Sequence, residues 1–170
     1  IEEDGQLVSM LHLNPYTMIV NGYEVKVNYI VAVATLKKYR HRGYMRALLE
    51  KALLDMAEQN MPFAFLMPAS ESIYAPFDFV WICSHTSLSP RISRMDADDQ
   101  NRYLASRYQL FCKRDERYME NAEAQSRAED GEVFTGKMPP YMARITDVCQ
   151  MLCLVNSTQE REIYLHVKDS

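Results

Sequence analysis

The sequence predicts an α/β (α+β) fold, in which both strands and helices occur along the chain. Residues 29–36 (Tyr-Ile-Val-Ala-Val-Ala-Thr-Leu) are apolar on both alternating faces, which is typical of a central strand covered on both sides. Apolar residues recur at steps of three and four over residues 45–57, which indicates an amphipathic helix that ends before Pro62. Residues 63–67 then form a second buried strand.

Short strands and turns precede the central strand. Asn-Pro at positions 14–15 is a turn signal, and Asn21-Gly22 is the strongest two-residue hairpin signal in the chain. Around these turns the sequence predicts strands at residues 7–13, 17–20 and 25–27, the last of which joins the central strand.

Beyond residue 67 the pattern is a helical turn (72–74), a strand (77–82) and then a polar stretch. Residues 96–130 are rich in Glu, Arg, Gln and Ala with a thin apolar stripe, which predicts one or two helices. The remaining predicted segments are a linker (136–140), a short helix (143–154) and a strand (163–167).

Composition excludes several classes of protein. The 170 residues are 48% hydrophobic and 25% charged, as in ordinary globular chains and unlike disordered, collagen-like or membrane-embedded ones. No apolar run approaches the roughly 20 residues that span a bilayer. The formal net charge of −4 disfavours nucleic acid as a partner. From the opening residues we expect no signal peptide, and because the chain opens with Ile close to a strand, we expect that an N-terminal piece is missing.

The four cysteines are too scattered for a disulfide framework or a zinc site. We expect reduced thiols in the core of a cytoplasmic protein at Cys83, Cys112, Cys149 and Cys153.

One decapeptide, residues 37–46 (Lys-Lys-Tyr-Arg-His-Arg-Gly-Tyr-Met-Arg), concentrates positive charge. It holds five of the seven Lys and Arg residues that precede position 86, and no acidic residue. Gly43 falls where the amphipathic helix begins. A helix N-terminus presents unpaired N–H groups and partial positive charge, a glycine there lets a phosphate approach the backbone, and arginines add charge-assisted bonds. The stretch therefore predicts a pyrophosphate site.

An alternative stays open, in which the decapeptide is a solvated basic loop that precedes a helix. Two known phosphate motifs are excluded. No Gly-Lys-Ser/Thr of a Walker loop follows, and a dinucleotide fingerprint needs three glycines.

Two motifs carry a resemblance to a known family. Residues 40–45 (Arg-His-Arg-Gly-Tyr-Met) resemble the acyl-CoA motif Arg/Gln-x-x-Gly-x-Gly/Ala of the GNAT N-acetyltransferase superfamily, although Met45 departs from the usual small residue. Residues 68–79 (Pro-Ala-Ser-Glu-Ser-Ile-Tyr-Ala-Pro-Phe-Asp-Phe) resemble a segment of its enhanced-intracellular-survival (Eis-like) branch, in which a bulky residue commonly replaces that small one. The resemblance implies a GNAT acyl-CoA N-acyltransferase fold, which is a mixed, twisted sheet with flanking helices.

Two later stretches resemble other parts of the same branch, namely a helix of its second GNAT-like domain (residues 108–118) and the entry to its sterol-carrier-like domain (residues 141–148). The resemblance implies three regions. They are an acetyl-CoA-binding GNAT domain without its opening elements (1–90), a shortened helical second GNAT-like region (91–138) and the beginning of a sterol-carrier-like domain (139–170).

Carried over residue by residue, the resemblance implies a site for acetyl-CoA. The backbone of residues 33–35 would hold the pantetheine arm like an added strand: Val33, Ala34 and Thr35. The residues that would hold the pyrophosphate are Arg40, His41, Arg42, Gly43, Tyr44, Met45 and Arg46. Ser70 and Glu71 would contact the coenzyme beside the acetyl group, or else serve as a helix N-cap and an acidic first-turn residue.

Tyr74 aligns with the family's general acid, which protonates the departing CoA thiolate. A phenol suits that role, because its reference pKa of about 10 keeps it protonated at neutral pH while exceeding that of a thiol only modestly. The structural alternative is a core tyrosine that packs under Phe77. The family's general base is its own C-terminal carboxylate, and because Ser170 follows what resembles the middle of a domain, no residue is assigned as the base.

These expectations combine into an N-acetyltransferase that moves an acetyl group from acetyl-CoA directly to an amine in a ternary complex, without a metal. The acceptor would be a small molecule, such as a polyamine or an aminoglycoside, and the protein a cytoplasmic homo-oligomer. The alternative is a CoA-binding module without catalysis, with a role in regulation or assembly. A lipid carrier is disfavoured, because a tail of about thirty residues is too short to enclose a lipid.

Overall fold

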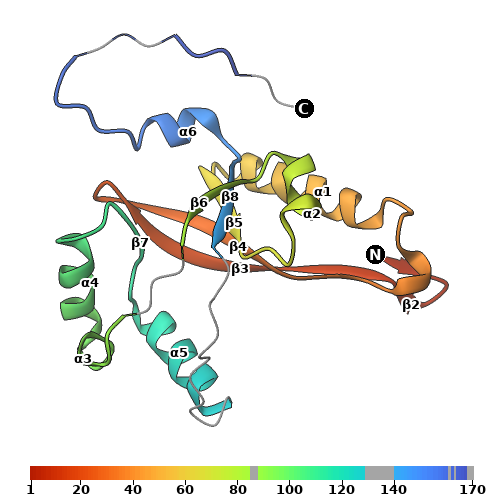
Figure 1. Ribbon diagram of the computed structural model, residues 1–170, viewed down its shortest axis with the longest axis horizontal. Helices are drawn as coiled ribbons and strands as arrows, with labels where there is room; N and C mark the ends of the chain where they lie inside the picture. Colours follow the sequence, from red (N-terminus) through yellow and green to blue (C-terminus); the bar gives the residue numbers. More distant parts are fainter. Residues whose placement is uncertain (85–87, 129–139, 161, 163, 168–170) are drawn as a thin grey trace.

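A computed structural model describes residues 1–84, 88–128, 140–160, 162 and 164–167. Its main feature is a six-stranded sheet in the order β6-β8-β5-β4-β3-β7, with a separate hairpin of β1 and β2 (Figure 1). The strands are β1 (Glu2–Glu3), β2 (Gln6–Leu7), β3 (Ser9–Val20), β4 (Tyr23–Thr35), β5 (Phe63–Leu66), β6 (Val80–Cys83), β7 (Leu110–Cys112) and β8 (Tyr141–Ile145). The helices are α1 (Tyr44–Glu58), α2 (Glu71–Tyr74), α3 (Pro90–Ser93), α4 (Ala97–Ala105), α5 (Glu116–Ala128) and α6 (Val148–Leu152), with 3₁₀ turns at Lys37–Tyr39 and Ala75–Phe77.

The sheet is mixed, as the resemblance implies. Within it, β4 and β5 run parallel and are joined by α1, whereas the other neighbouring strands run antiparallel. The predicted helix at 45–57 and the predicted strand at 63–67 are confirmed as α1 and β5, to within a residue at either end. The α/β class is therefore confirmed.

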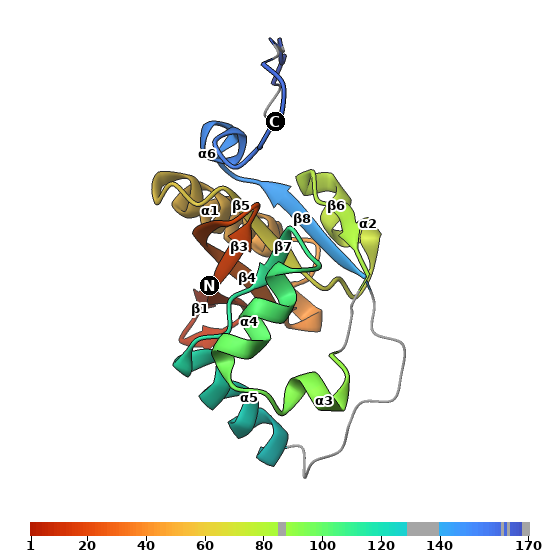
Figure 2. The same ribbon diagram turned by 90° about the vertical axis from the view of Figure 1, so that its left-hand side faces the viewer.

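Two groups of buried side chains lie on opposite faces of the sheet. Because side chains alternate along a strand, Ala64 and Leu66 of β5 pack on one face with α1, whereas Phe63 packs on the other face with Val27 of β4. Figure 1 shows α1 along one side of the sheet and α5 on the other. In the turned view, α3, α4 and α5 group together below the strands (Figure 2).

The hairpin of β3 and β4 confirms one turn predicted from the sequence and contradicts another. Asn21 and Gly22 have φ angles of 50° and 88°, the two positive values that a type I′ turn requires. The turn predicted at residues 14–15 is wrong, because β3 continues through both. Pro15 pairs with Asn28 of β4, and β7 reaches β3 only at residues 18–20. Pro15 thus lies where β3 has no second neighbour among the described strands, so its missing N–H removes no ladder bond.

Four predictions of secondary structure fail, two of them because long-range pairing decides the backbone. The predicted helix at 143–154 is instead β8 followed by α6, because residues 142–145 pair with β5. The short strand β7 lies inside the stretch expected to be helical, because it pairs with β3. Residues 164–167 form no strand, and Ile163 lies outside the described residues. Strand β6 begins at Val80 and not at Phe77, because Phe77 closes a 3₁₀ turn and Asp78 has a φ of 59°.

Strand β8 comes from the region that the resemblance assigns to a sterol-carrier-like domain. In the structure it lies between β5 and β6, both from residues 1–90. Residues 141–145 thus share one sheet with the N-terminal half. The division of the chain into three domains stays a prediction.

All four cysteines are unpaired. The expectation that they lie in the core is wrong, because Cys83, Cys149 and Cys153 are exposed and Cys112 is partly buried. Among the described residues, no helix is both long enough and apolar enough to cross a membrane.

Candidate functional site

The parallel strands β4 and β5 separate halfway along β4. They pair only at residues 28–30 and 64–66, after which β5 ends and β4 continues to Thr35. A bulge accompanies the separation, because Ala32 has a φ of 53° and the register with β3 shifts there. Ala32 and Ala34 are exposed, so the expectation of a strand covered on both sides fails for this half. The end of β4 is therefore left without a neighbour on the β5 side among the described strands.

Ser9 and Arg40 hold the end of β4 in place. The Ser9 hydroxyl, 2% exposed as a residue, donates to the carbonyl oxygen of Ala34 at 3.2 Å and lies 2.8 Å from the Thr35 hydroxyl. Arg40 Nε donates to the carbonyl oxygen of Thr35 at 3.3 Å. Sequence reasoning missed Ser9, because a serine at the start of a strand carries no local signal of this long-range contact.

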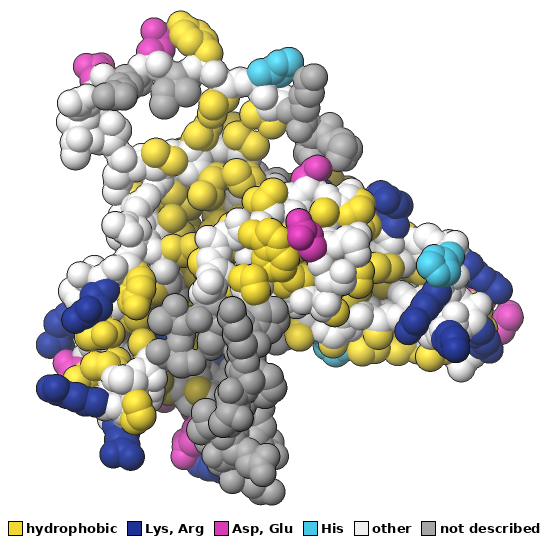
Figure 3. Space-filling model, viewed as in Figure 1, with side chains coloured by type: hydrophobic (Ala, Val, Ile, Leu, Met, Phe, Trp, Pro, Cys, Tyr) yellow, Lys and Arg dark blue, Asp and Glu magenta, His cyan; other side chains and the backbone are white. Residues whose placement is uncertain are grey.

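The loop from β4 to α1 turns on two residues with positive φ, His41 at 63° and Gly43 at 83°. Gly43 is the N-cap of α1, so the predicted helix start is confirmed. A Cβ placed on Gly43 would meet no atom within 4 Å, so the space beside it is open. The first N–H groups of α1, from Tyr44 onward, have no acceptor within the helix. In the space-filling view, Lys and Arg side chains gather over this end of the molecule (Figure 3).

Each arginine of the loop already has a partner. The Arg42 guanidinium lies 3.7 Å from the Glu3 carboxylate and 5.0 Å from the centre of the Tyr39 ring. Arg46 pairs with Glu50 at 3.1 Å and lies 4.8 Å from the centre of the Phe77 ring.

Tyr44 is tied to the same acid as Arg42. Its hydroxyl donates to Glu3 Oε2 at 2.6 Å, and this bond to a carboxylate raises the pKa of Tyr44 above its ordinary value. Glu3 is a second residue that sequence reasoning missed, since it lies far from the motif along the chain. Met45, also in the predicted set, is half-buried and packs against the core cluster.

Tyr74 is buried, with 7% of its surface exposed, in the core cluster that contains Phe77. Its ring meets Phe79 edge-on, with centres 6.0 Å apart. Burial raises the pKa of Tyr74, with a smaller contribution from Tyr29. The same cluster contains Ile30, where the pairing of β4 with β5 ends. We expect this packing if Tyr74 is a core tyrosine that packs under Phe77, and the catalytic role of Tyr74 stays a prediction.

Ser70 and Glu71 lie at the start of the four-residue helix α2, and both are exposed. Ser70 occupies the N-cap position but makes no side-chain capping bond; its hydroxyl lies 2.9 Å from that of Ser72. Glu71 is the acidic residue of the first turn. A role of either residue beside an acetyl group stays a prediction.

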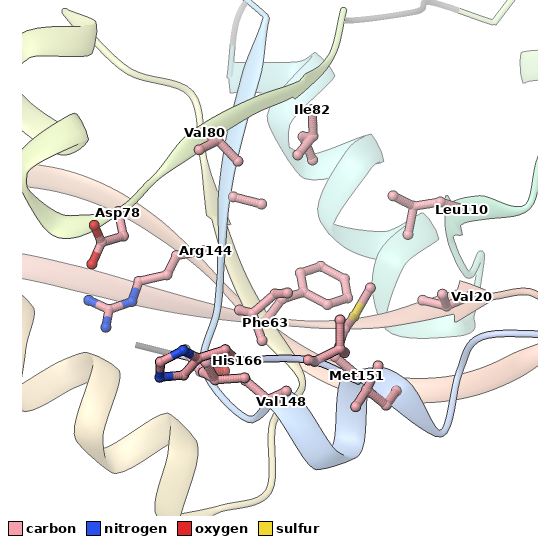
Figure 4. Close-up of a pocket in the computed structure, with 16 residues that line it drawn as sticks. Val20, Phe63, Asp78, Val80, Ile82, Leu110, Arg144, Val148, Met151 and His166 are labelled. Carbon is pink, nitrogen blue, oxygen red and sulfur yellow. The ribbon is translucent and has the colours of Figure 1, made fainter. Parts of the chain in front are cut away.

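A cavity of about 600 Å³ lies elsewhere, between β6, β8 and α6 (Figure 4). Its wall is mainly apolar and includes Phe63, Val80, Ile82 and Met151. None of the residues predicted for the coenzyme or for catalysis lines it. The structure thus brings together the end of β4 and residues 40–46, apart from this cavity.

Comparisons with known proteins concern the sequence family and the fold of the chain. Residues 1–82 match the family model of the acetyltransferase (GNAT) domain. A GCN5-related N-acetyltransferase from Kribbella flavida is 14% identical with a TM-score of 0.58, covering 88% of this chain and 60% of that one. Eis1 from Mycobacterium abscessus is 17% identical with a TM-score of 0.54, and the match covers 86% of this chain and 41% of that one. A probable N-acyltransferase from Enterococcus faecalis is 25% identical with a TM-score of 0.47, and the match covers 49% of this chain and 21% of that one.

The family model and the first two structures identify the fold. Residues 1–82 resemble a GNAT acetyltransferase domain in sequence, and the mixed sheet with its flanking helices has the GNAT fold. The chain spans between 21% and 60% of the length of the three solved structures. No curated protein matches it.

Proposed function

We propose that this protein binds acetyl-CoA at the loop between β4 and α1 and transfers the acetyl group to the amine of a small molecule. The observation that carries the proposal is the position of Gly43. It begins α1 with open space beside it, at the end where β4 separates from β5. Free N–H groups, partial positive charge and arginines at one point suit a pyrophosphate.

The expected reaction is a direct transfer in a ternary complex. The amine nitrogen attacks the thioester carbonyl carbon, the C–S bond then breaks, and the sulfur leaves as a thiolate that takes a proton. Backbone groups near Val33, on the stretch of β4 that lacks a neighbour on the β5 side among the described strands, would polarise the carbonyl. The amine proton leaves to a base to which no residue of this chain is assigned.

Tyr74 is the proposed source of the proton for the thiolate. Its raised pKa keeps the phenol protonated at neutral pH, which a proton donor requires. A polyamine or aminoglycoside acceptor, the Eis-like branch, a homo-oligomer and a cytoplasmic location are further parts of the proposal, and they rest on the sequence resemblance.

Calorimetric titration with acetyl-CoA tests the coenzyme site, with Gly43→Glu as the disabling variant. We expect a dissociation constant on the order of micromolar for the wild type. Gly43→Glu should show no binding, because its carboxylate would face the pyrophosphate.

Gly22→Glu is the matched control. Gly22 has a φ of 88° against 83° for Gly43, and a Cβ at either position meets no atom within 4 Å. The control therefore carries the same backbone strain and the same added charge, but in the β3–β4 turn. If the wild type gives no heat and no thermal shift, or if Gly43→Glu binds as well as Gly22→Glu does, the proposal is wrong.

A further inference from the structure

The carboxylate of Glu3 brings a negative charge to a loop that has none of its own. Residues 37–46 contain no acid. Glu3 Oε2 accepts the Tyr44 hydroxyl at 2.6 Å, and Oε1 lies 3.7 Å from Arg42 Nη1. Glu3 therefore contacts the two side chains that flank Gly43.

The hairpin that carries Glu3 is fixed beside the end of β4. Glu3 pairs with Gln6 across the hairpin of β1 and β2. The N–H of Val8 donates to the carbonyl oxygen of Ile1 at 2.9 Å, and that of Leu36 donates to Val8 at the same distance. These backbone bonds thus hold the hairpin that carries Glu3 beside the end of β4.

An anion that binds at Gly43 meets Glu3 as a competitor. The Arg42 and Glu3 side chains are 52% and 37% exposed, so their ion pair is weak and can be exchanged. A pyrophosphate that takes the guanidinium replaces the carboxylate as its partner, so the loss of the Arg42–Glu3 attraction offsets part of the gain in binding.

We propose that Glu3 sets the affinity of the coenzyme site by competing with the pyrophosphate of CoA for Arg42. In the free protein Glu3 holds Arg42 and Tyr44, and on binding Arg42 exchanges a carboxylate for a phosphate. The same competition favours release of the CoA product, because Glu3 recovers Arg42 as the phosphate leaves. The inference rests on the proposed function, since it takes CoA as the ligand.

Glu3→Gln is the test, because the amide oxygen still accepts the Tyr44 hydroxyl while the charge is removed. Calorimetry with CoA should show binding about two- to fivefold tighter than in the wild type, the range that an exposed ion pair supplies. The dissociation rate of CoA should fall in proportion.

Glu2→Gln is the matched control, because it removes the same charge from the neighbouring residue, whose side chain points to the other face of the strand. It should bind CoA as the wild type does. In an Arg42→Gln background, Glu3→Gln should no longer tighten binding, because the group competed for is gone. A purely structural role of Glu3 would weaken binding instead.

The outcomes separate the two proposals. If the wild type binds CoA but Glu3→Gln binds it no more tightly than Glu2→Gln does, the role of Glu3 is overturned and the proposed function stands. If Glu3→Gln tightens CoA binding equally with and without Arg42, the role of Glu3 is overturned as well. Wild-type protein that binds no CoA overturns both.

Discussion

Tyr74 combines two demands on one side chain. Its ring fills the core between α1 and the sheet, edge-on to Phe79, and its hydroxyl is the proposed proton donor. Packing depends on the ring, whereas proton transfer depends on the oxygen alone. Removing only the oxygen therefore separates the two roles.

We expect Tyr74→Phe to lower the rate of acetyl transfer far more than the affinity for CoA. The hydroxyl acts only as the thiolate leaves, so its loss raises the free energy of the transition state and leaves that of the ground-state complex unchanged. Loss of a general acid costs roughly 10²–10⁴-fold in rate. Thiol release from acetyl-CoA with a polyamine or aminoglycoside, beside a CoA titration, measures both effects.

Tyr164→Phe, at a side chain 88% exposed, serves as the control for that measurement. Unchanged turnover in Tyr74→Phe would show that Tyr74 is a packing residue only. A wild type that binds CoA but transfers acetyl to no amine would favour the binding module without catalysis.

At the scale of elements, β8 decides how the C-terminal part joins the fold. It pairs with β5 on one side and β6 on the other, and its second residue, Met142, is 1% exposed within the core cluster that includes residues of α1. A strand between two others contributes to the core as much as its neighbours do. The sheet therefore depends on residues from beyond position 140.

Met142→Ala should destabilise the whole N-terminal fold by about 2–5 kcal/mol, the usual cost of such a truncation in a core. Leu152→Ala in α6, where the leucine is 47% exposed, should change the free energy of unfolding by at most about 0.5 kcal/mol. Urea unfolding followed by circular dichroism measures both. Equal stability of the two variants would show that β8 does not belong to this core, and would favour a separate domain from residue 139.

At the scale of the whole molecule, a cluster of aromatic rings joins distant elements on the sheet face opposite α1. Tyr16 of β3 lies 6.2 Å from Tyr29 of β4 and 6.5 Å from Tyr118 of α5, and Phe65 of β5 lies 6.1 Å from Tyr141 of β8, between ring centres. Burial raises the pKa of each of these tyrosines, that of Tyr141 to about 12.

Stability should therefore fall as the pH rises from about 10 towards 12. In that window the unfolded chain loses phenol protons that the folded chain keeps, so ionisation favours unfolding; below it, the contribution is fully present. Urea unfolding at pH 8 and at pH 11, followed by the fluorescence of Trp81, measures the loss. Tyr141→Phe should reduce the dependence on pH, and Tyr164→Phe should not. An equal free energy of unfolding at both pH values would contradict the cluster.

Local patterns were enough to predict the elements that position the candidate site. The period of three and four residues predicted α1, the Asn-Gly pair predicted the turn between β3 and β4, and Gly43 marked the start of the helix. In each case the deciding interactions lie within a few residues of one another, so the sequence alone determines them.

Only the tertiary structure decided the rest. Pro15 is compatible with a strand because β3 lacks a second neighbour there among the described strands, and residues 141–145 form a strand because they exchange hydrogen bonds with β5 and β6. Ser9, at the start of β3, contacts the end of β4, and Glu3 of the β1–β2 hairpin contacts Arg42 and Tyr44. These outcomes depend on partners tens of residues away. A local pattern of side chains records what a segment favours by itself, whereas backbone pairing and burial across the sheet determine which of those preferences the folded chain keeps.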